Sequence, residues 1–206
     1  MTMTWKPSRL SSHRRTLVLD TSAVLNMLAC GTAARLLGAL DLTLIVPQQV
    51  IVEVKREPVV PDDPSHSMEG LLQRGALQAH HLTGSGYDTF IELAAAEPPD
   101  GLGDGEAATI ATAEQLACEC VIDERKAIRI ARGRRADVGV LCSLDLFLIA
   151  EERKAFAAEV LADLVFKALF HARMRVPQNH RAWVLSLIGA ERAAQCSSLA
   201  AALRAR

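Results

Sequence analysis

The sequence contains few of the features that mark zinc proteins, secreted proteins or membrane proteins. Its five cysteines are odd in number, and no pair shows the C-x-x-C spacing of a zinc site. No segment is long and apolar enough to span a bilayer. Residues 1–15 are polar and basic without an apolar centre, which is unlike a secretory signal. These absences predict a protein of the reducing cytoplasm with no membrane partner.

The sequence also has few aromatic residues and a net charge close to zero. Aromatic side chains make up 4% of the 206 residues, although half of the chain is hydrophobic, and abundant Ala and Leu favour helices. The net charge of −1 gives no overall attraction to nucleic acid. Residues 151–206 nevertheless hold nine Lys or Arg against five Asp or Glu, so the remainder is acidic. This distribution is compatible with a metal site beside an anionic substrate, but it does not require one.

The most informative stretch reads T-L-V-L-D-T-S, from Thr16 to Ser22. An apolar run without alternation predicts a strand that is buried on both faces in a parallel sheet. Asp20 would then lie at the carboxyl end of a central strand, which is the edge where open α/β sheets bind ligands. The alternative is that Asp20 only caps the helix that follows.

The rest of the chain alternates between expected strands and helices, which predicts an α/β fold with right-handed crossovers. The central sheet should be mostly parallel, with about five strands flanked by helices. Residues 1–14 are expected to be a flexible N-terminus, 15–154 one domain, and 155–206 a helical C-terminal extension.

Further acids are expected at the same sheet edge as Asp20. Asp123 ends the expected strand at 120–122, while Asp104 and Glu106 open a helix and Glu53 follows the second strand. Each has an ordinary alternative, because a surface Glu or an acid in the first turn of a helix needs no other role. Together they would repel one another unless a cation lay between them. Mg²⁺ or Mn²⁺ suits such oxygen ligands and could support phosphodiester hydrolysis.

Three segments resemble those of PIN-domain proteins. They are V-L-D-T-S-A-V-L-N, G-L-G-D-G-E-A-A-T-I-A-T-A and V-I-D-E-R-K-A-I-R-I-A. Their order and spacing are similar to a bacterial and archaeal subgroup marked by a G-x-G-E-A box and a D-E-R-K-A box. The likeness covers about residues 16–152, and the tail is also similar to the helical extension of that subgroup.

The resemblance implies a three-layer PIN-like fold and a metal-dependent endoribonuclease using Mg²⁺ or Mn²⁺. Its acidic residues fall on Asp20, Glu53, Glu106 and Asp123, with Asp20, Glu106 and Asp123 as metal ligands and Asp104 as an auxiliary ligand. Ser22 and Ser143 occupy positions where hydroxyl groups line the site. The resemblance also implies the toxin of a toxin–antitoxin pair, with an antitoxin partner and a homodimer.

Two positions depart from the subgroup. Ile128 stands where an Arg is common in the D-E-R-K-A box, and Arg129 follows it. Cys142 replaces the Gly that usually precedes the hydroxyl residue of the last box. Neither departure removes an expected ligand, so any difference should concern the contacts with substrate.

Basic residues follow Asp123 closely. We expect Arg125, Lys126 and Arg129 to hold RNA phosphates, which Lys and Arg can do without reading sequence. The alternative is a solvated helix face.

Two other functions fit parts of the pattern. A non-catalytic nucleic-acid-binding or protein-binding member of the same fold would not need to bind Mn²⁺. A phosphohydrolase or receiver-type domain would use Asp20 as phosphoryl acceptor. The haloacid-dehalogenase type needs a second Asp where Ser22 stands, and the acidic pair and late Lys of receiver domains are not in place.

Overall fold

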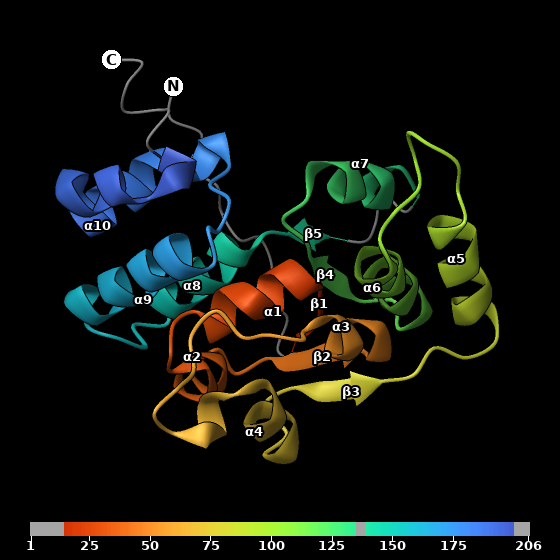
Figure 1. Cartoon of the computed structure of the whole chain (residues 1–206), viewed down its shortest axis with the longest axis horizontal. Coiled ribbons are helices and arrows are strands. Elements are labelled where there is room, and N and C mark those ends of the chain that lie inside the picture. Colours follow the sequence, from red (N-terminus) through yellow and green to blue (C-terminus); the bar gives the residue numbers. More distant parts are fainter. Residues whose placement is uncertain (1–14, 135–138, 200–206) are drawn as a thin grey trace.

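A computed structural model describes residues 15–134 and 139–199 of the chain (Figure 1). The expected flexible N-terminus, residues 1–14, lies outside these ranges. The described part contains five strands, which are β1 (Thr16–Leu19), β2 (Thr43–Pro47), β3 (Gln78–His80), β4 (Glu119–Val121) and β5 (Val140–Leu141).

The five strands form one parallel sheet in the order β3-β2-β1-β4-β5. The chain moves outward from β1 through β2 to β3 and then returns to the other side of β1. The strand order therefore reverses between β1 and β4. In doubly wound sheets this reversal opens a crevice at the carboxyl ends of the two strands, where ligands bind.

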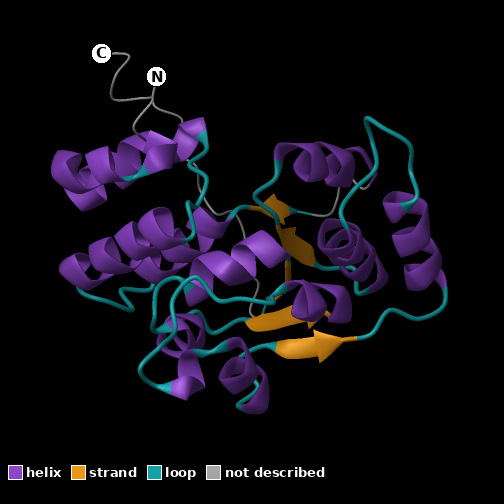
Figure 2. Cartoon of the chain, viewed as in Figure 1, coloured by secondary structure: helices purple, strands orange, loops and turns teal. Residues whose placement is uncertain are grey.

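Helices cover both faces of the sheet (Figure 2). Those before the sheet reversal are α1 (Thr21–Leu28), α2 (Ala33–Ala39), α3 (Gln48–Glu53), the 3-10 turn η1 (Pro64–His66), α4 (Met68–Gln73) and α5 (Ser85–Ala94). Those after it are α6 (Asp104–Gln115), α7 (Arg125–Arg134), α8 (Ser143–Glu152), α9 (Ala158–His171), the 3-10 turn η2 (Gln178–His180) and α10 (Arg181–Gln195).

The side chains on the two faces of β1 belong to two separate hydrophobic clusters. Leu17 and Leu19 pack with residues from α1, α2, α8 and α9, whereas Val18 packs with residues from α5, α6 and α7. Successive side chains of a strand point to opposite faces, so a strand with no polar residue must be covered on both. The result is the predicted three-layer α/β fold of a PIN-like domain.

The helical extension shares the first of these clusters. Leu164 and Leu169 of α9 and Val184 and Ile188 of α10 belong to the same group of buried side chains as Leu17 of the central strand. The predicted helical extension therefore buries its apolar side chains in the same core as the central strand. The helix α10 bends at Gly189, whose φ of 78° few other residues adopt.

None of the helices in residues 15–134 and 139–199 is by itself long and apolar enough to cross a membrane. Within the described part of the chain, one pair of helices, α1 and α2, reaches the required length and composition together, and the pair is bent by 112°.

Candidate active site at the carboxyl edge of the sheet

The reversal of the strand order brings two aspartates together. Asp20 directly follows β1 and Asp123 lies just beyond β4, the neighbouring strand. Both carboxylates are almost fully buried, with 2% and 6% of the residue surface exposed. Asp residues are rarely buried to this extent unless they are paired or bound to a metal.

Asp20 is held in place as the N-cap of α1. Its Oδ1 accepts a hydrogen bond of 2.6 Å from the backbone N–H of Ala23, and the Ser22 hydroxyl donates to both carboxylate oxygens at 2.9 Å. Burial and, next, the negative charge of Asp123 raise the pKa of Asp20 to about 7, although these hydrogen bonds oppose the shift. Asp20 is therefore an N-cap whose ionised form is disfavoured by its surroundings.

Asp123 is fixed by residues from two other elements. Its Oδ1 accepts from the backbone N–H of Ser143 at 2.8 Å, and its Oδ2 accepts from the Ser143 hydroxyl at 2.6 Å and from Asn26 Nδ2 at 2.7 Å. Burial raises the pKa of Asp123 above its usual value despite the hydrogen bonds from Ser143. The N-terminus of α8 and the middle of α1 thus orient this carboxylate.

Glu53 reaches the site from the last residue of α3. Its Oε1 accepts a hydrogen bond of 2.8 Å from the backbone N–H of Gly105, and its Oε2 accepts from the hydroxyl of Thr21. A Cβ at position 105 would overlap both Glu53 Oε2 and Thr21 Oγ1. The second glycine of the G-x-G-E box is therefore needed for the close approach of Glu53 to α6.

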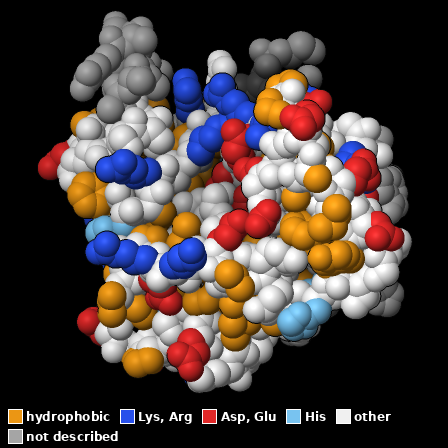
Figure 3. All heavy atoms as spheres, turned by 45° about the vertical axis from the view of Figure 1, so that its right-hand side comes forward, with side chains coloured by type: hydrophobic (Ala, Val, Ile, Leu, Met, Phe, Trp, Pro, Cys, Tyr) orange, Lys and Arg blue, Asp and Glu red, His pale blue; other side chains and the backbone are white. Residues whose placement is uncertain are grey.

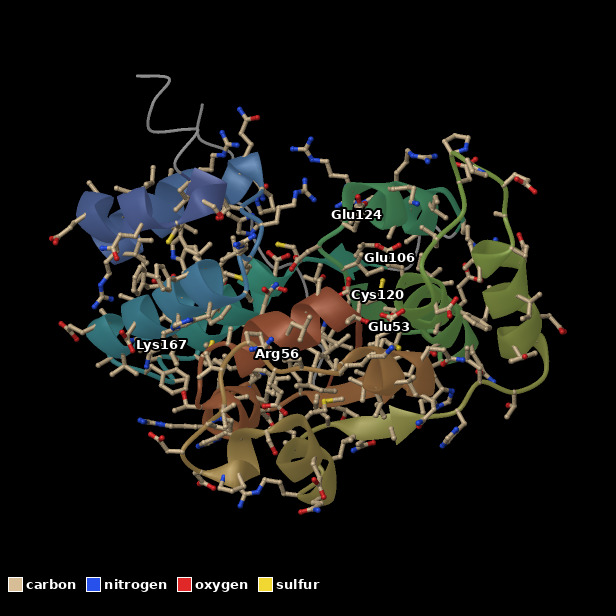
Figure 4. The ribbon with its side chains drawn as sticks, viewed as in Figure 1. Glu53, Arg56, Glu106, Cys120, Glu124 and Lys167 are labelled. Atoms are coloured by element: carbon tan, nitrogen blue, oxygen red, sulfur yellow. The ribbon has the colours of Figure 1, made fainter. Side chains whose placement is uncertain are left out.

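Glu106 projects from the first turn of α6. Its Oε2 accepts from the backbone N–H of Gly103 at 3.2 Å, so it also caps its own helix. Burial is the main cause that raises the pKa of Glu106, and the charges of Glu124 and Glu53 act in the same direction. Figure 4 shows Glu53, Glu106 and Glu124 one above another beside α3, α6 and α7.

These acids line one open cavity of about 510 Å³, which we call the acidic cavity. Figure 3 shows acidic side chains along a hollow in the surface, with Lys and Arg side chains gathered at its upper rim. The wall opposite the acids comes from the loop after α9, residues 172–175. In this loop Arg175 donates a hydrogen bond to the backbone carbonyl of Asp123, and Arg173 has the left-handed φ of 55°.

Other residues expected at the site lie around this cavity or apart from it. Ser22 lines the cavity, whereas Ser143 is buried behind Asp123. Asp104 is exposed and does not contribute to the cavity wall.

The three expected phosphate ligands of α7 differ in their surroundings. Lys126 donates to the backbone carbonyl of Gly101, and Arg129 pairs with Asp100 at 2.7 Å. Arg125 is exposed and lines a second cavity beside the first.

The donor set fits a hard divalent cation. A carboxylate offers about four lone-pair directions. The hydrogen bonds described above use three of them at Asp20 and three at Asp123, two at Glu53 and one at Glu106, so each carboxylate keeps at least one lone pair for a cation. All these ligand atoms are oxygens, which Mg²⁺ and Mn²⁺ prefer. A cation held there by Asp20, Asp123 and Glu106 would offset the repulsion from Asp123 that, after burial, raises the pKa of Asp20.

A different group of potential ligands lies beyond Asp123. One atom each from Cys142, Asp145 and His180 falls within 4.8 Å of the others, close enough to share a metal ion. His180 Nε2 lies 2.9 Å from Asp145 Oδ1, and the backbone N–H of Cys142 donates to Asp145 Oδ2 at 2.8 Å. Burial raises the pKa of the Cys142 thiol, which keeps it protonated and makes it a weaker ligand.

Several residues at the cavity were not predicted. Asn26 lies one helical turn after Ser22, and this i, i+4 spacing from a candidate residue could have identified it. Glu124 directly follows Asp123 and lines the same cavity. Arg173 and Arg175 carry no such signal, because only the packing of the extension brings them to the sheet edge.

A family profile described as a PIN domain matches residues 16–190. The match extends through α9 and most of α10, so the extension belongs to the matched region as much as the sheet does. No curated protein and no solved structure matches the chain. The chain belongs to the PIN-domain family, whose members are generally nucleases.

Proposed function

We propose that the protein is an endoribonuclease that depends on Mg²⁺ or Mn²⁺. The observation that carries the proposal is the pair of buried aspartates at the sheet reversal, Asp20 and Asp123. Burial and, next, the charge of Asp123 raise the pKa of Asp20. Two buried carboxylates that repel each other favour a bound cation. When bound, a divalent cation lowers the pKa of a water molecule and offsets the charge that develops on a phosphodiester.

The buried residues of the acidic cavity and those at its rim would have different roles. Asp20 and Asp123 are rigid and buried, so they would set the position of the cation. Glu106, at the more accessible rim, would add a third ligand, and the exposed carboxylate of Glu53 beside it can hold a water molecule or accept its proton. Asn26, Ser22 and Ser143 would keep the two aspartates in position through the hydrogen bonds described above.

The choice of RNA rests on the resemblance of the three sequence boxes to the toxin-like PIN subgroup. The same likeness supports a toxin of a toxin–antitoxin pair in the cytoplasm, with an antitoxin protein as partner and a homodimer as the assembly. The non-catalytic binding member of the fold is the alternative, and metal binding separates the two.

The first test compares two acids of the same helical turn. Glu106 lines the cavity and Asp104 does not, so we expect Glu106→Gln to lower cleavage at least 10-fold and Asp104→Asn to leave it within about twofold. The measurement is cleavage of single-stranded and structured RNA by purified protein with Mn²⁺ and with EDTA. Cleavage that persists in EDTA, or that falls equally in both variants, would contradict the proposal.

A binding measurement completes this test. Calorimetric titration with Mn²⁺ should show binding to the wild-type protein and weaker binding to Glu106→Gln. Absence of both cleavage and Mn²⁺ binding in the wild type would establish the non-catalytic alternative instead.

Gly105→Ala tests the placement of Glu53 without touching its carboxylate. The new Cβ would occupy the space of Glu53 Oε2, and the exposed Glu53 side chain can swing away into solvent. We therefore expect cleavage to fall about 10-fold or more, while alanine in a helix offsets much of the strain, so that the thermal midpoint changes little.

Gly38→Ala is the matched control for this substitution. Gly38 lies in α2, and a Cβ there meets nothing within 4 Å. This variant should gain up to about 1 kcal/mol of stability and keep full cleavage. Equal cleavage by Gly105→Ala and Gly38→Ala would show that the position of Glu53 does not matter.

A further inference from the structure

A second cavity, of about 360 Å³, lies between α7 and the segment that leads into α10. Its wall combines one face of α7, the end of β5, and the chain from Arg175 to His180. Arg175 lines this cavity and the acidic cavity as well. The two cavities are therefore neighbours that share a guanidinium group at their boundary.

Three arginines give the second cavity a positive character. Arg125 and Arg132 lie seven residues apart on α7, which places them on the same helix face, and Arg175 faces them from the extension. No carboxylate pairs with Arg125 or Arg132 among residues 15–134 and 139–199. Among the described residues, the acid in the wall is Asp145, which is engaged by His180 and by the backbone N–H of Cys142.

The other basic residues of α7 are engaged differently. Arg129 pairs with Asp100, and Arg134 pairs with Glu92 and Glu114. The helix thus divides its arginines between ion pairs that hold the fold together and a pair directed into the cavity. Guanidinium groups without protein partners are well suited to phosphate, which they can bind through two parallel hydrogen bonds.

We propose that this second cavity is a phosphate-binding subsite, in which Arg125 and Arg132 hold the backbone of an RNA strand whose neighbouring phosphate lies in the acidic cavity. The inference rests on the proposed function, since the acidic cavity must hold the phosphate that is cleaved. Arg175, anchored on the carbonyl of Asp123, links the two cavities and guides the strand from one to the other.

The proposal predicts that binding depends on strand length. A short oligonucleotide can fill one cavity, whereas a longer one can fill both. Contacts to phosphate alone add affinity with no base preference and make binding sensitive to salt. The two arginines should therefore increase affinity for strands of any sequence, and more for long strands than for the shortest.

The test measures fluorescence anisotropy of labelled single-stranded RNA of 4 and 12 nucleotides with Asp20→Asn protein that cannot cleave. Saturating Mn²⁺ is present, so that the acidic cavity can hold a phosphate. Arg132→Gln added to this protein should weaken binding of the 12-mer about 3- to 10-fold and lower the slope of log affinity against log salt by about 0.7. Binding of the 4-mer should change less. Lys167→Gln is the matched control, because Lys167 lies on α9, pairs with Asp163 and lines neither cavity, and it should bind both strands as before.

The outcomes separate this inference from the nuclease proposal. Equal binding by the Arg132→Gln and Lys167→Gln proteins, equal losses for both strand lengths, or no binding of RNA at all would overturn the subsite, whether or not the wild type cleaves RNA. A selective loss of 12-mer binding supports the subsite even if the wild-type protein proves unable to cleave.

Discussion

Asp20→Asn should abolish RNA cleavage and, in the absence of metal, make the protein more stable. Asn keeps the side-chain oxygen that caps α1, since Asn and Asp are equally good N-caps. It removes the buried charge that Asp123 repels, and with it a principal metal ligand. We expect cleavage to fall at least 100-fold, because even a residue that only orients a ligand typically costs 10- to 100-fold.

The gain in stability follows from the sign of the pKa shift. The pKa of Asp20 is about 7 in the folded protein, whereas that of an ordinary aspartate is 3.8. The folded state therefore binds the proton more tightly, and the metal-free protein loses stability as the pH rises from about 4 to about 7. The full shift corresponds to an upper bound of about 4 kcal/mol, and we expect about 1–3 kcal/mol because water entering the cavity relieves part of the cost.

Thermal unfolding in EDTA at several pH values measures this effect. The midpoint of Asp20→Asn should exceed that of the wild type by roughly 3–10 °C at pH 7.5. The difference should shrink as the pH falls toward 4, where wild-type Asp20 is protonated. Added Mn²⁺ should raise the wild-type midpoint more than that of the variant. A constant difference at all pH values, or full cleavage by the variant, would contradict the account.

The central part of the fold and the placement of two acids could be predicted from local pattern alone. The apolar run of β1 has no polar face, so it must be a central strand, and parallel strands expose their carboxyl ends at one edge. Asp20 and Asp123 each follow such a strand, and the structure brings them together at the sheet reversal.

The sequence presented capping and metal binding as alternatives, and the structure shows that capping does not exclude a second role. Asp20 accepts the N–H of Ala23 and Glu106 accepts the N–H of Gly103, so both are caps. Both also line the acidic cavity. A carboxylate at a helix N-terminus has lone pairs left over, and the cap fixes the direction in which they point.

The basic residues could not be assigned from the sequence. Arg129 and Arg132 are three positions apart in one run, yet one pairs with Asp100 and the other lines a cavity. Their difference depends on which distant segment packs beside each face of α7. The contributions of Arg173 and Arg175 depend on the same packing, because the loop after α9 reaches the sheet edge only once the extension has folded against α8 and α1.

We expect the largest loss of stability from removing the contact between Asp145 and His180, which holds the chain that follows the loop at 172–175. Asp145 of α8 and His180 of η2 are both buried and lie 2.9 Å apart, and His180 begins the turn into α10. Burial alone would raise the pKa of Asp145, but its hydrogen bonds with His180 and the Cys142 N–H outweigh burial and hold the pKa below its usual value. The pair therefore stabilises the folded state at neutral pH.

Asp145→Ala should lower the free energy of unfolding by about 3–5 kcal/mol, because it leaves a buried histidine and a backbone N–H without partners. Asp145→Asn keeps the acceptor for Cys142 and should cost less than half as much. Chemical denaturation at pH 7 measures both. Since the folded pKa is depressed, the difference between wild type and Asp145→Asn should persist above pH 5 and shrink only as the pH falls below about 4.

The same variants test whether the extension belongs to the working site. Asp145 does not line the acidic cavity, yet its loss should loosen the chain between Arg175 and α10. We therefore expect Asp145→Asn, under conditions where it remains folded, to weaken RNA binding while leaving Mn²⁺ affinity close to that of the wild type. Parallel losses of both would mean that Asp145 acts through Asp123 and Ser143, and that the extension only covers the core.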